Sequence, residues 1–351
     1  MPKILVDRGV LDGSVAALPL DWLKDFECLP FSPRDLAAHT AELAVADGLI
    51  VRTLTRVTRA IAAHAPRLRA VATLSSGVDH IDEQALQDQN IVLLTGRGGN
   101  ARPVADWVQW ALARLHPDPL AGKRVLVVGV GAVGSEVAQR LETLQMQVFS
   151  CDPPRQIAQP DLDSIDLDLA LNQLWDVVTL HVPLTQHGQH ATENLLNSQR
   201  LQRLNGAILL NAARGGVLDE QAAMQLRQGN RLRSLAVDTF VAEPRPDRFF
   251  VQACDLATPH IAGHSVEGKF RVARIAVAAL RHHFSLAPPG ELAEAVEKFC
   301  ELSQIHQPLT AFVGLDLVAA HMRDSAARGE SFETIRHEHR RFELSASQNR
   351  A

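Results

Sequence analysis

Three side chains in the second half of the chain could together carry out acid–base chemistry on a small anion. Arg214, Glu243 and His260 each follow a short apolar run that has the pattern of a buried strand. An arginine can bind a carboxylate through two parallel hydrogen bonds, and a histidine can transfer a proton near neutral pH. A carboxylate beside the histidine stabilises the protonated imidazole. Singly, they could be a surface cation, a loop charge and a buried structural histidine, but together they predict one catalytic group.

A glycine-rich loop precedes these residues and directly follows an apolar strand pattern. Its first glycine permits a tight turn, its second lets a pyrophosphate approach the backbone, and its third allows close packing of helix on strand. The N-terminus of the following helix supplies amide hydrogens to the phosphates. The residues predicted to bind a cofactor here are Gly129, Gly131, Ala132, Val133 and Gly134.

An acidic residue, Asp152, lies 21 residues after Gly131 at the end of the next predicted strand. A carboxylate at this offset accepts hydrogen bonds from ribose hydroxyls and repels a 2′-phosphate, so the sequence favours NAD over NADP. Arg155 lies close enough to keep NADP as an alternative. The glycines could also form a turn without a ligand, but the acidic residue at this spacing argues against that interpretation.

Apolar runs alternate with helical patterns along most of the chain, which predicts parallel sheets covered by helices on both faces. A first series of strands is predicted at residues 3–6, 46–51 and 70–74. A second series is predicted at residues 124–128, 147–150, 177–181, 207–211, 234–238 and 255–258. The helical patterns include residues 101–115, 136–143, 220–228 and 266–284. The second series has the order of a dinucleotide-binding sheet.

We therefore predict an α/β protein with two doubly wound parallel-sheet domains and a small C-terminal segment of residues 287–351. The first domain would be flavodoxin-like and discontinuous, with residues 1–100 completed by 262–286. Residues 101–261 would form a Rossmann domain that binds NAD. Two chain crossings between the domains would place a ligand cleft between them. The charged run at 336–341 is interpreted as a solvated helix face or, alternatively, as an oligomer contact.

Composition excludes several classes of protein. The chain has 351 residues, of which 46% are hydrophobic and 21% are charged, so disorder over the whole length is excluded. A net charge of −5 argues against a general nucleic-acid binder. No apolar run approaches the length of a membrane span or a signal peptide. The four cysteines are scattered without metal-ligand or disulfide spacing, so we expect no metal site and a cytoplasmic location.

The chain resembles the NAD-dependent D-2-hydroxyacid dehydrogenases over residues 1 to about 285, and within that superfamily it is most similar to the erythronate-4-phosphate dehydrogenases of vitamin B6 biosynthesis. The broader resemblance rests on the glycine loop and on the motifs at 180–184, 211–216, 238–244 and 258–263. The narrower one rests on the segments at 4–7, 51–57, 76–82, 151–155 and 258–269.

This resemblance implies that Arg214 and Glu243 are catalytic and that His260 is the proton donor. It implies further NAD contacts from Val182, Ala212, Ala213, Asp238 and Gly263, and substrate contacts from Thr53, Ser75 and His264. It also implies a homodimer formed through the C-terminal segment.

The residue types beside those substrate positions suit an anionic ligand. Ser75, Ser76 and Gly77 offer hydroxyls and backbone amides to a carboxylate or phosphate. Arg52 and Arg56 offer positive charges to a terminal phosphate, although Arg56 could equally be a solvated surface residue.

The chain departs from the family pattern at three places. His264 stands where the family usually has tyrosine, and the chain contains no tyrosine at all. Asp106 replaces a glutamate, which we interpret as a structural change. The C-terminal segment is shorter than in the family, and only fragments such as residues 332–336 and 340–342 resemble it.

The leading hypothesis is NAD-dependent oxidation of 4-phospho-D-erythronate to its 2-oxo acid, with hydride leaving C2. Another D-2-hydroxyacid dehydrogenase, acting on glycerate, phosphoglycerate, glyoxylate or hydroxypyruvate, is the alternative enzyme. An NAD-sensing binding protein is the alternative from a different class, but it has no need of a proton donor such as His260.

Overall fold

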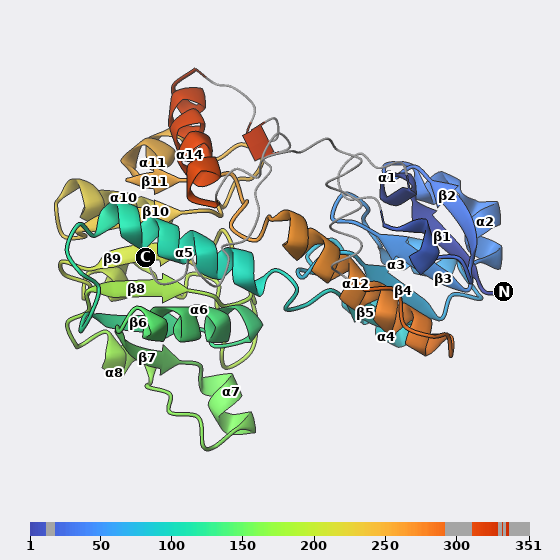
Figure 1. Ribbon diagram of the computed structural model, residues 1–351, viewed down its shortest axis with the longest axis horizontal. Coiled ribbons are helices and arrows are strands. Elements are labelled where there is room, and N and C mark those ends of the chain that lie inside the picture. The colour runs from blue at the N-terminus through green and yellow to red at the C-terminus, as the bar shows by residue number, and fades with distance from the viewer. Residues whose placement is uncertain (12–17, 292–310, 329–331, 333–334, 337–351) are drawn as a thin grey trace. The chain divides into compact units, whose positions relative to one another are not determined.

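The computed structural model describes residues 1–11, 18–291, 311–328, 332 and 335–336. The chain forms two compact units, and each is built around a parallel sheet (Figure 1). One unit comprises Met1–Asn100 and Ser265–Pro308, and the other comprises Ala101–His264 and Leu309–Ala351. The predicted fold class of two doubly wound α/β units is therefore confirmed.

The first unit contains a sheet with the strand order β2-β1-β3-β4-β5 in its described part. This is the order of flavodoxin-like sheets, in which β2 lies on one side of the first strand and the later strands are added in sequence on its other side. The three inner strands are fully buried or nearly so, which explains their continuous apolar sequences. The strands are β1 (Lys3–Asp7), β2 (Glu27–Phe31), β3 (Gly48–Val51), β4 (Ala70–Thr73) and β5 (Val92–Thr95).

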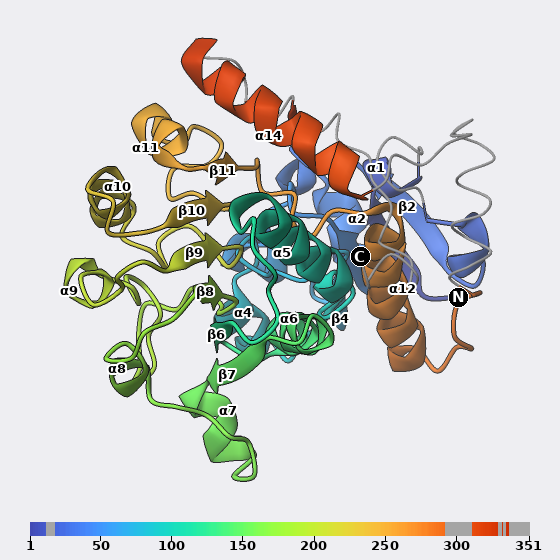
Figure 2. The same cartoon turned by 60° about the vertical axis from the view of Figure 1, so that its left-hand side comes forward.

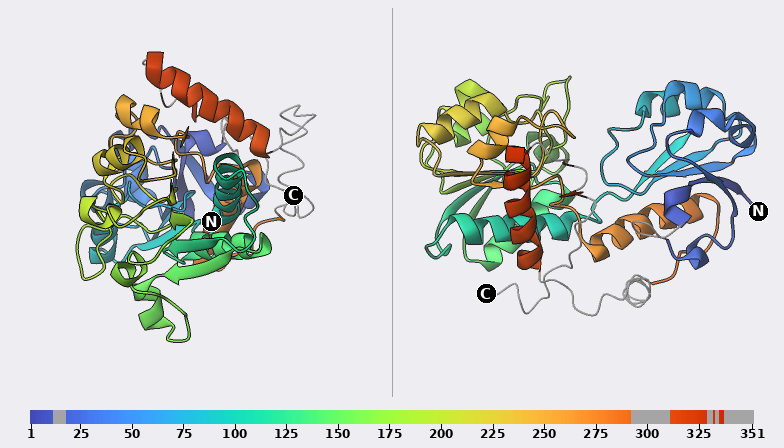
Figure 3. Two further views of the ribbon diagram at one scale, coloured as in Figure 1. Left: turned by 90° about the vertical axis from the view of Figure 1, so that its left-hand side faces the viewer. Right: turned by 90° about the horizontal axis from the view of Figure 1, so that it is seen from above.

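Helices cover both faces of this sheet. Figure 3 shows α12 (Val266–His283) on one face and the blue helices of residues 40–88 on the other. Helix α12 begins at a Ser265 cap, whose hydroxyl accepts a hydrogen bond from the Gly268 amide at 2.8 Å, and it packs on β4 and β5. The remaining helices are α1 (Arg8–Leu11), α2 (Thr40–Val45), α3 (Arg59–Ala63) and α4 (Glu83–Asp88), with 3-10 turns at Leu20–Trp22 and Leu36–Ala38.

The second unit contains a sheet with the order β11-β10-β9-β8-β6-β7 in its described part. In the usual Rossmann order, another strand lies beyond the strand that corresponds to β7. At that edge of the described sheet, the Ile165 amide donates a hydrogen bond to the Ser150 carbonyl at 2.8 Å, but the segment does not form a strand. The strands are β6 (Arg124–Val128), β7 (Gln147–Cys151), β8 (Val177–Leu180), β9 (Ile208–Asn211), β10 (Ser234–Val237) and β11 (Leu256–Ala257).

Helices α5 and α6 lie on one face of the second sheet, and α8, α9 and α10 lie on the other (Figures 2 and 3). Helix α5 buries Trp107 and Trp110 completely. The helices of this unit are α5 (Ala101–Leu115), α6 (Ala132–Thr143), α7 (Pro153–Ala158), α8 (Leu167–Ala170), α9 (Ser198–Leu201), α10 (Glu220–Gln228), α11 (Arg248–Ala253) and α14 (Ala311–Arg328).

Two strands, β2 and β5, are not among those predicted from the sequence. Both lie at edges of the first sheet, and each exposes residues that a buried strand would not. Strand β2 contains Pro30, which cannot donate a ladder hydrogen bond and so weakens the strand pattern. Strand β5 begins at Val92, which is 43% exposed.

Candidate active site

The pairing register of the second sheet brings the ends of five strands to one edge. Val128 of β6 pairs with Leu180 of β8, which pairs with Asn211 of β9. Asn211 pairs with Val237 of β10, which pairs with Ala257 of β11. Each predicted polar loop begins directly after one of these residues. The carboxyl edge of a doubly wound sheet is where such proteins bind their ligands.

The glycine loop after β6 has the geometry needed to hold a pyrophosphate. Gly129 has a φ of +85°, which side-chain-bearing residues rarely adopt. A Cβ on Gly134 would lie 1.8 Å from the Gly129 carbonyl oxygen, so only glycine permits this packing of α6 on β6. A Cβ on Gly131 would meet nothing within 4 Å, so the space above the helix N-terminus is open. This open cradle fits the phosphates of NAD.

Asp152 follows β7 and lies against the glycine loop. Its Oδ2 accepts a hydrogen bond from the Val130 amide at 2.8 Å, and its Oδ1 caps α7 by accepting one from the Arg155 amide at 3.0 Å. Each oxygen has a second lone pair that can accept a ribose hydroxyl. The Arg155 guanidinium donates to Ser135 Oγ at 2.7 Å, on the first turns of α6. The glycine loop that would bind NAD therefore also fixes the position of the Asp152 carboxylate.

The strongest catalytic feature is a pair between His260 and Glu243. His260 Nδ1 lies 2.7 Å from Glu243 Oε2, and Glu243 Oε1 accepts a hydrogen bond from the Phe240 amide at 2.9 Å. Both side chains keep part of their surface exposed, at 29% for His260 and 22% for Glu243. Burial alone would raise the pKa of Glu243, but the hydrogen bond and charge of His260 bring it below its usual value. The carboxylate is thus ionised and can stabilise a protonated imidazole.

The backbone at His260 is held in an unusual conformation by Asp238. His260 has a φ of +54°, and its amide donates to the Asp238 carbonyl at 2.7 Å. The Asp238 carboxylate accepts hydrogen bonds from the amides of Ile261 and Ala262 at 2.8 and 2.9 Å. Burial raises the pKa of Asp238 despite these donors. The resemblance implies an NAD contact for Asp238, but in this structure its carboxylate anchors the loop that carries His260.

Two buried side chains that sequence reasoning missed complete this anchor. Thr258 Oγ1 donates to Asp238 Oδ1 at 2.5 Å and accepts from Trp107 Nε1 at 2.9 Å. Trp107 belongs to α5, so the loop is tied to a helix 151 residues earlier in the chain. The Thr-Pro-His motif marks this threonine, but its tryptophan partner could not be identified without the fold.

Arg214 lies on the loop after β9, the strand that pairs with β10. The Asn211 side chain shapes this loop, because its Oδ1 accepts from the Ala213 amide at 3.1 Å and its Nδ2 donates to the Arg214 carbonyl at 3.3 Å. Arg214 Nη1 donates to the Ala213 carbonyl at 2.8 Å. Asn211 is almost completely buried and was not among the predicted functional residues.

The other predicted NAD contacts of this unit lie at or near the same edge. Ala213 is buried, whereas Ala212, Val182 and Gly263 are half-buried. A Cβ on Gly129 would lie 2.7 Å from Val182 Cγ1, so Val182 borders the glycine loop. His264 is half-buried, and its amide donates to the Ile261 carbonyl at 2.8 Å. Their roles in ligand binding stay predictions.

In the first unit, the predicted substrate serines lie on a hydrogen-bonded loop after β4. Ser75 Oγ lies 2.7 Å from Thr73 Oγ1 and donates to the Gly77 carbonyl at 2.7 Å. Thr73 Oγ1 also lies 3.0 Å from His80 Nε2. Ser76 Oγ donates to Asn100 Oδ1 at 2.7 Å. The loop is therefore pre-formed, with its hydroxyl groups already oriented.

Arg52 has a protein partner that the sequence did not predict. Its Nε and Nη2 donate to the carboxylate of Asp7 at 3.1 and 3.0 Å, and Asp7 is completely buried. Asp7 is the last residue of β1 and Arg52 directly follows β3, which pairs with β1; this explains their contact across 45 residues of sequence. Thr53 and Arg56 are exposed on the same loop. Arg52 therefore stabilises the unit in addition to any part in binding phosphate.

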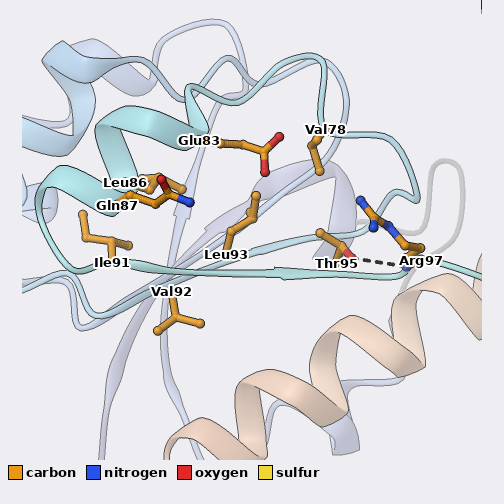
Figure 4. A pocket seen from close by; sticks show the side chains of 9 residues that line it. All are labelled: Val78, Glu83, Leu86, Gln87, Ile91, Val92, Leu93, Thr95 and Arg97. Atoms are coloured by element: carbon orange, nitrogen blue, oxygen red, sulfur yellow. Dashed lines mark hydrogen bonds between the residues drawn. The ribbon is translucent and has the colours of Figure 1, made fainter. Parts of the chain in front are cut away.

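A pocket of about 470 Å³ lies elsewhere in the first unit, beside α4 and β5 (Figure 4). Glu83 and Arg97 are its charged residues, and the rest of its lining is largely apolar. It contains none of the predicted site residues. Among the described residues, no group of three or more histidine, cysteine, aspartate or glutamate side chains could hold a metal ion. Among the same residues, no helix is both long enough and apolar enough to span a membrane.

Comparison with known proteins identifies relatives of the chain. Residues 84–262 match the family described as "D-isomer specific 2-hydroxyacid dehydrogenase, NAD binding domain". The erythronate-4-phosphate dehydrogenase of Chromohalobacter salexigens is 38% identical over 297 residues, which cover 83% of this chain and 75% of the relative. That of Pseudomonas paraeruginosa is 40% identical over 239 residues, covering 67% of this chain and 62% of the relative.

A solved structure of similar fold is that of the TT0316 protein from Thermus thermophilus. It has a TM-score of 0.65 and 28% sequence identity, and the match covers 82% of this chain and 99% of that protein. The chain thus spans nearly all of this structural neighbour, but less than two thirds of the Pseudomonas relative.

Proposed function

We propose that this chain, which belongs to the D-isomer specific 2-hydroxyacid dehydrogenase family and within it to the erythronate-4-phosphate dehydrogenases, oxidises 4-phospho-D-erythronate to its 2-oxo acid with NAD. The observation that carries this proposal is the His260–Glu243 pair. Glu243 follows β10 and His260 follows β11, and these neighbouring strands belong to the sheet that carries the glycine loop. As an NAD-dependent oxidoreductase acting on a CH–OH group, the protein would then catalyse a step of vitamin B6 biosynthesis.

The proton in this reaction would be handled by His260. Its Nδ1 is occupied by Glu243, so Nε2 is the nitrogen that accepts the C2 hydroxyl proton. The imidazole becomes positively charged as it does so, and the Glu243 carboxylate 2.7 Å away stabilises that charge. NAD, when bound at the glycine loop, supplies the acceptor for the C2 hydride. The same two side chains serve the reverse reaction, in which His260 donates the proton.

Arg214 would bind the substrate carboxylate and polarise the C2 oxygen. Its guanidinium has the geometry to bind a carboxylate through two hydrogen bonds. We propose that Thr53, Ser75, Ser76, Gly77 and His264 supply further donors to the substrate. The pre-formed hydrogen bonds of the serine loop support this assignment, because a binding loop that is already ordered loses less entropy on binding.

A spectrophotometric assay of NAD reduction tests the proposal. The acids 4-phospho-D-erythronate and D-erythronate differ only in the phosphate, and glycerate with 3-phosphoglycerate forms a second matched pair. The proposal predicts the highest kcat/KM with 4-phospho-D-erythronate. A clear preference for an unphosphorylated acid would instead support the glycerate or glyoxylate type of dehydrogenase.

The phosphate end of the substrate is best tested at Arg56. Replacement of Arg52 would leave the buried Asp7 carboxylate without its ionic partner, and such a loss destabilises a protein. Arg56 is exposed, so Arg56→Ala should leave folding unchanged. If Arg56 contacts the phosphate, this variant should lose part of the preference for 4-phospho-D-erythronate over D-erythronate.

We further propose a homodimer that works in the cytoplasm. The dimer follows from the resemblance of the C-terminal segment to the family's dimerisation domain. Cys28, Cys151 and Cys254 are free thiols, which suits a reducing compartment. Light scattering coupled to size-exclusion chromatography should give a mass near twice 38.3 kDa.

A further inference from the structure

The C-terminal part of the second unit packs beside the loop that carries Glu243. Helix α14 packs on α5, α11 and β11, as the red helix of Figure 2 shows. Asp316 on this helix accepts a hydrogen bond from Trp110 Nε1 at 3.0 Å and forms an ion pair with Arg114 at 2.6 Å. Trp110 and Arg114 belong to α5. These contacts fix the helix on the body of the unit.

Farther along the chain, Phe332 packs directly on the catalytic loop. Its ring meets that of Phe240 edge-on, with ring centroids 6.2 Å apart, and only 4% of the residue is exposed. Phe250 of α11 makes a similar contact with Phe240 at 6.0 Å. The Phe240 amide donates a hydrogen bond to Glu243 Oε1. Phe332 therefore packs on the residue that binds the catalytic carboxylate.

We propose that Phe332 is a positioning residue for the His260–Glu243 pair. By packing on Phe240, it fixes the turn whose amide donates to the Glu243 carboxylate. The inference deepens the proposed function and rests on it for the kinetic consequences, but the contacts themselves lie within one unit and do not depend on the substrate.

A readout without substrate separates this inference from the proposed function. The NMR signals of the His260 ring, assigned by their loss in His260→Asn, should change position in Phe332→Ala and return in Phe332→Leu. Changed signals in a protein that oxidises no 2-hydroxy acid would refute the function and leave the positioning role intact. Unchanged signals in Phe332→Ala would overturn the role of Phe332.

The kinetic test changes the size of the side chain at position 332. Phe332→Ala should lower kcat/KM by about tenfold because Phe240 loses a packing partner, whereas Phe332→Leu, which keeps an apolar side chain, should recover most of the loss. Binding of NAD, followed by quenching of protein fluorescence, should be unchanged in both. Equal kcat/KM for Phe332→Ala and the wild type would show that Phe332 only completes the core.

Discussion

Glu220 should make the stability of the protein depend on pH near neutrality. This residue begins α10, and its carboxylate accepts a hydrogen bond from the Val241 amide in the catalytic loop. Burial raises the pKa of Glu220 from 4.5 to about 7, the Val241 amide opposes the shift, and the charges of Asp247 and Glu243 add to it. Glu220→Gln removes the titration and keeps an oxygen for the amide.

The sign and size of this pH dependence of the unfolding free energy follow from the linkage between protonation and folding. Because the folded state binds this proton more tightly than the unfolded state, the stabilisation it gives is complete below pH 4.5 and is lost as the pH rises towards 7. The full shift corresponds to about 3 kcal/mol at 1.36 kcal/mol per unit. Since the side chain is only partly buried, solvent screening reduces this to about 1–2 kcal/mol. Glu220→Gln should therefore be more stable than the wild type by that amount at pH 8.5.

Urea denaturation at several pH values measures this difference directly. The wild type and Glu220→Gln should have similar free energies of unfolding at pH 4.5–5, and the difference should grow up to about pH 7 and then stay constant. Glu142→Gln, at an exposed position on α6, should follow the wild type throughout. A constant difference between Glu220→Gln and the wild type across the whole range would contradict this prediction, because it would mean that Glu220 titrates at the same pH in the folded and unfolded states.

Other consequences concern the cofactor loop, the arginine loop and a buried ion pair. Gly131→Ala should weaken NAD binding at least about tenfold in a fluorescence titration without lowering the melting temperature, because its Cβ would enter the open cradle, where no protein atom lies within 4 Å of it. Asn211→Ala should lower kcat/KM by about 10- to 100-fold, since Arg214 loses the side chain that shapes its loop; an unchanged value would remove Asn211 from the mechanism. Asp106→Ala should cost about 3–5 kcal/mol of unfolding free energy in denaturant titrations, because Arg140, which Asp106 binds at 2.8 Å, is buried.

Much of the second unit could be predicted from the sequence because its strands are buried and its turns carry glycine. Strand β6 and helix α10 begin and end at the predicted residues. Helix α6 begins four residues before the predicted start, since the sequence pattern became helical only after the glycine loop. Helix α7 was missed, although Asp152 and the two prolines after it are a recognisable start of a helix.

Contacts between distant residues account for what the sequence could not predict. The ion pair of Arg52 with Asp7 depends on the adjacency of β1 and β3, and the Trp107–Thr258 hydrogen bond depends on where α5 packs. The family resemblance implies an NAD contact for Asp238, which stays a prediction; the structure adds three hydrogen bonds from the His260 loop to its carboxylate. Residue type and spacing identify the candidate site residues. The fold determines which of them can contact a ligand and which position other site residues.

The most direct test of the central claim is the activity of His260→Ala compared with its binding of NAD. We expect this variant to bind NAD like the wild type, because the glycine loop and Asp152 are unaffected, and we expect kcat for the 2-hydroxy acid to fall by about 100-fold or more. If His260→Ala keeps most of the wild-type turnover at pH 7, the proton does not pass through His260, and the assignment of the His260–Glu243 pair is wrong.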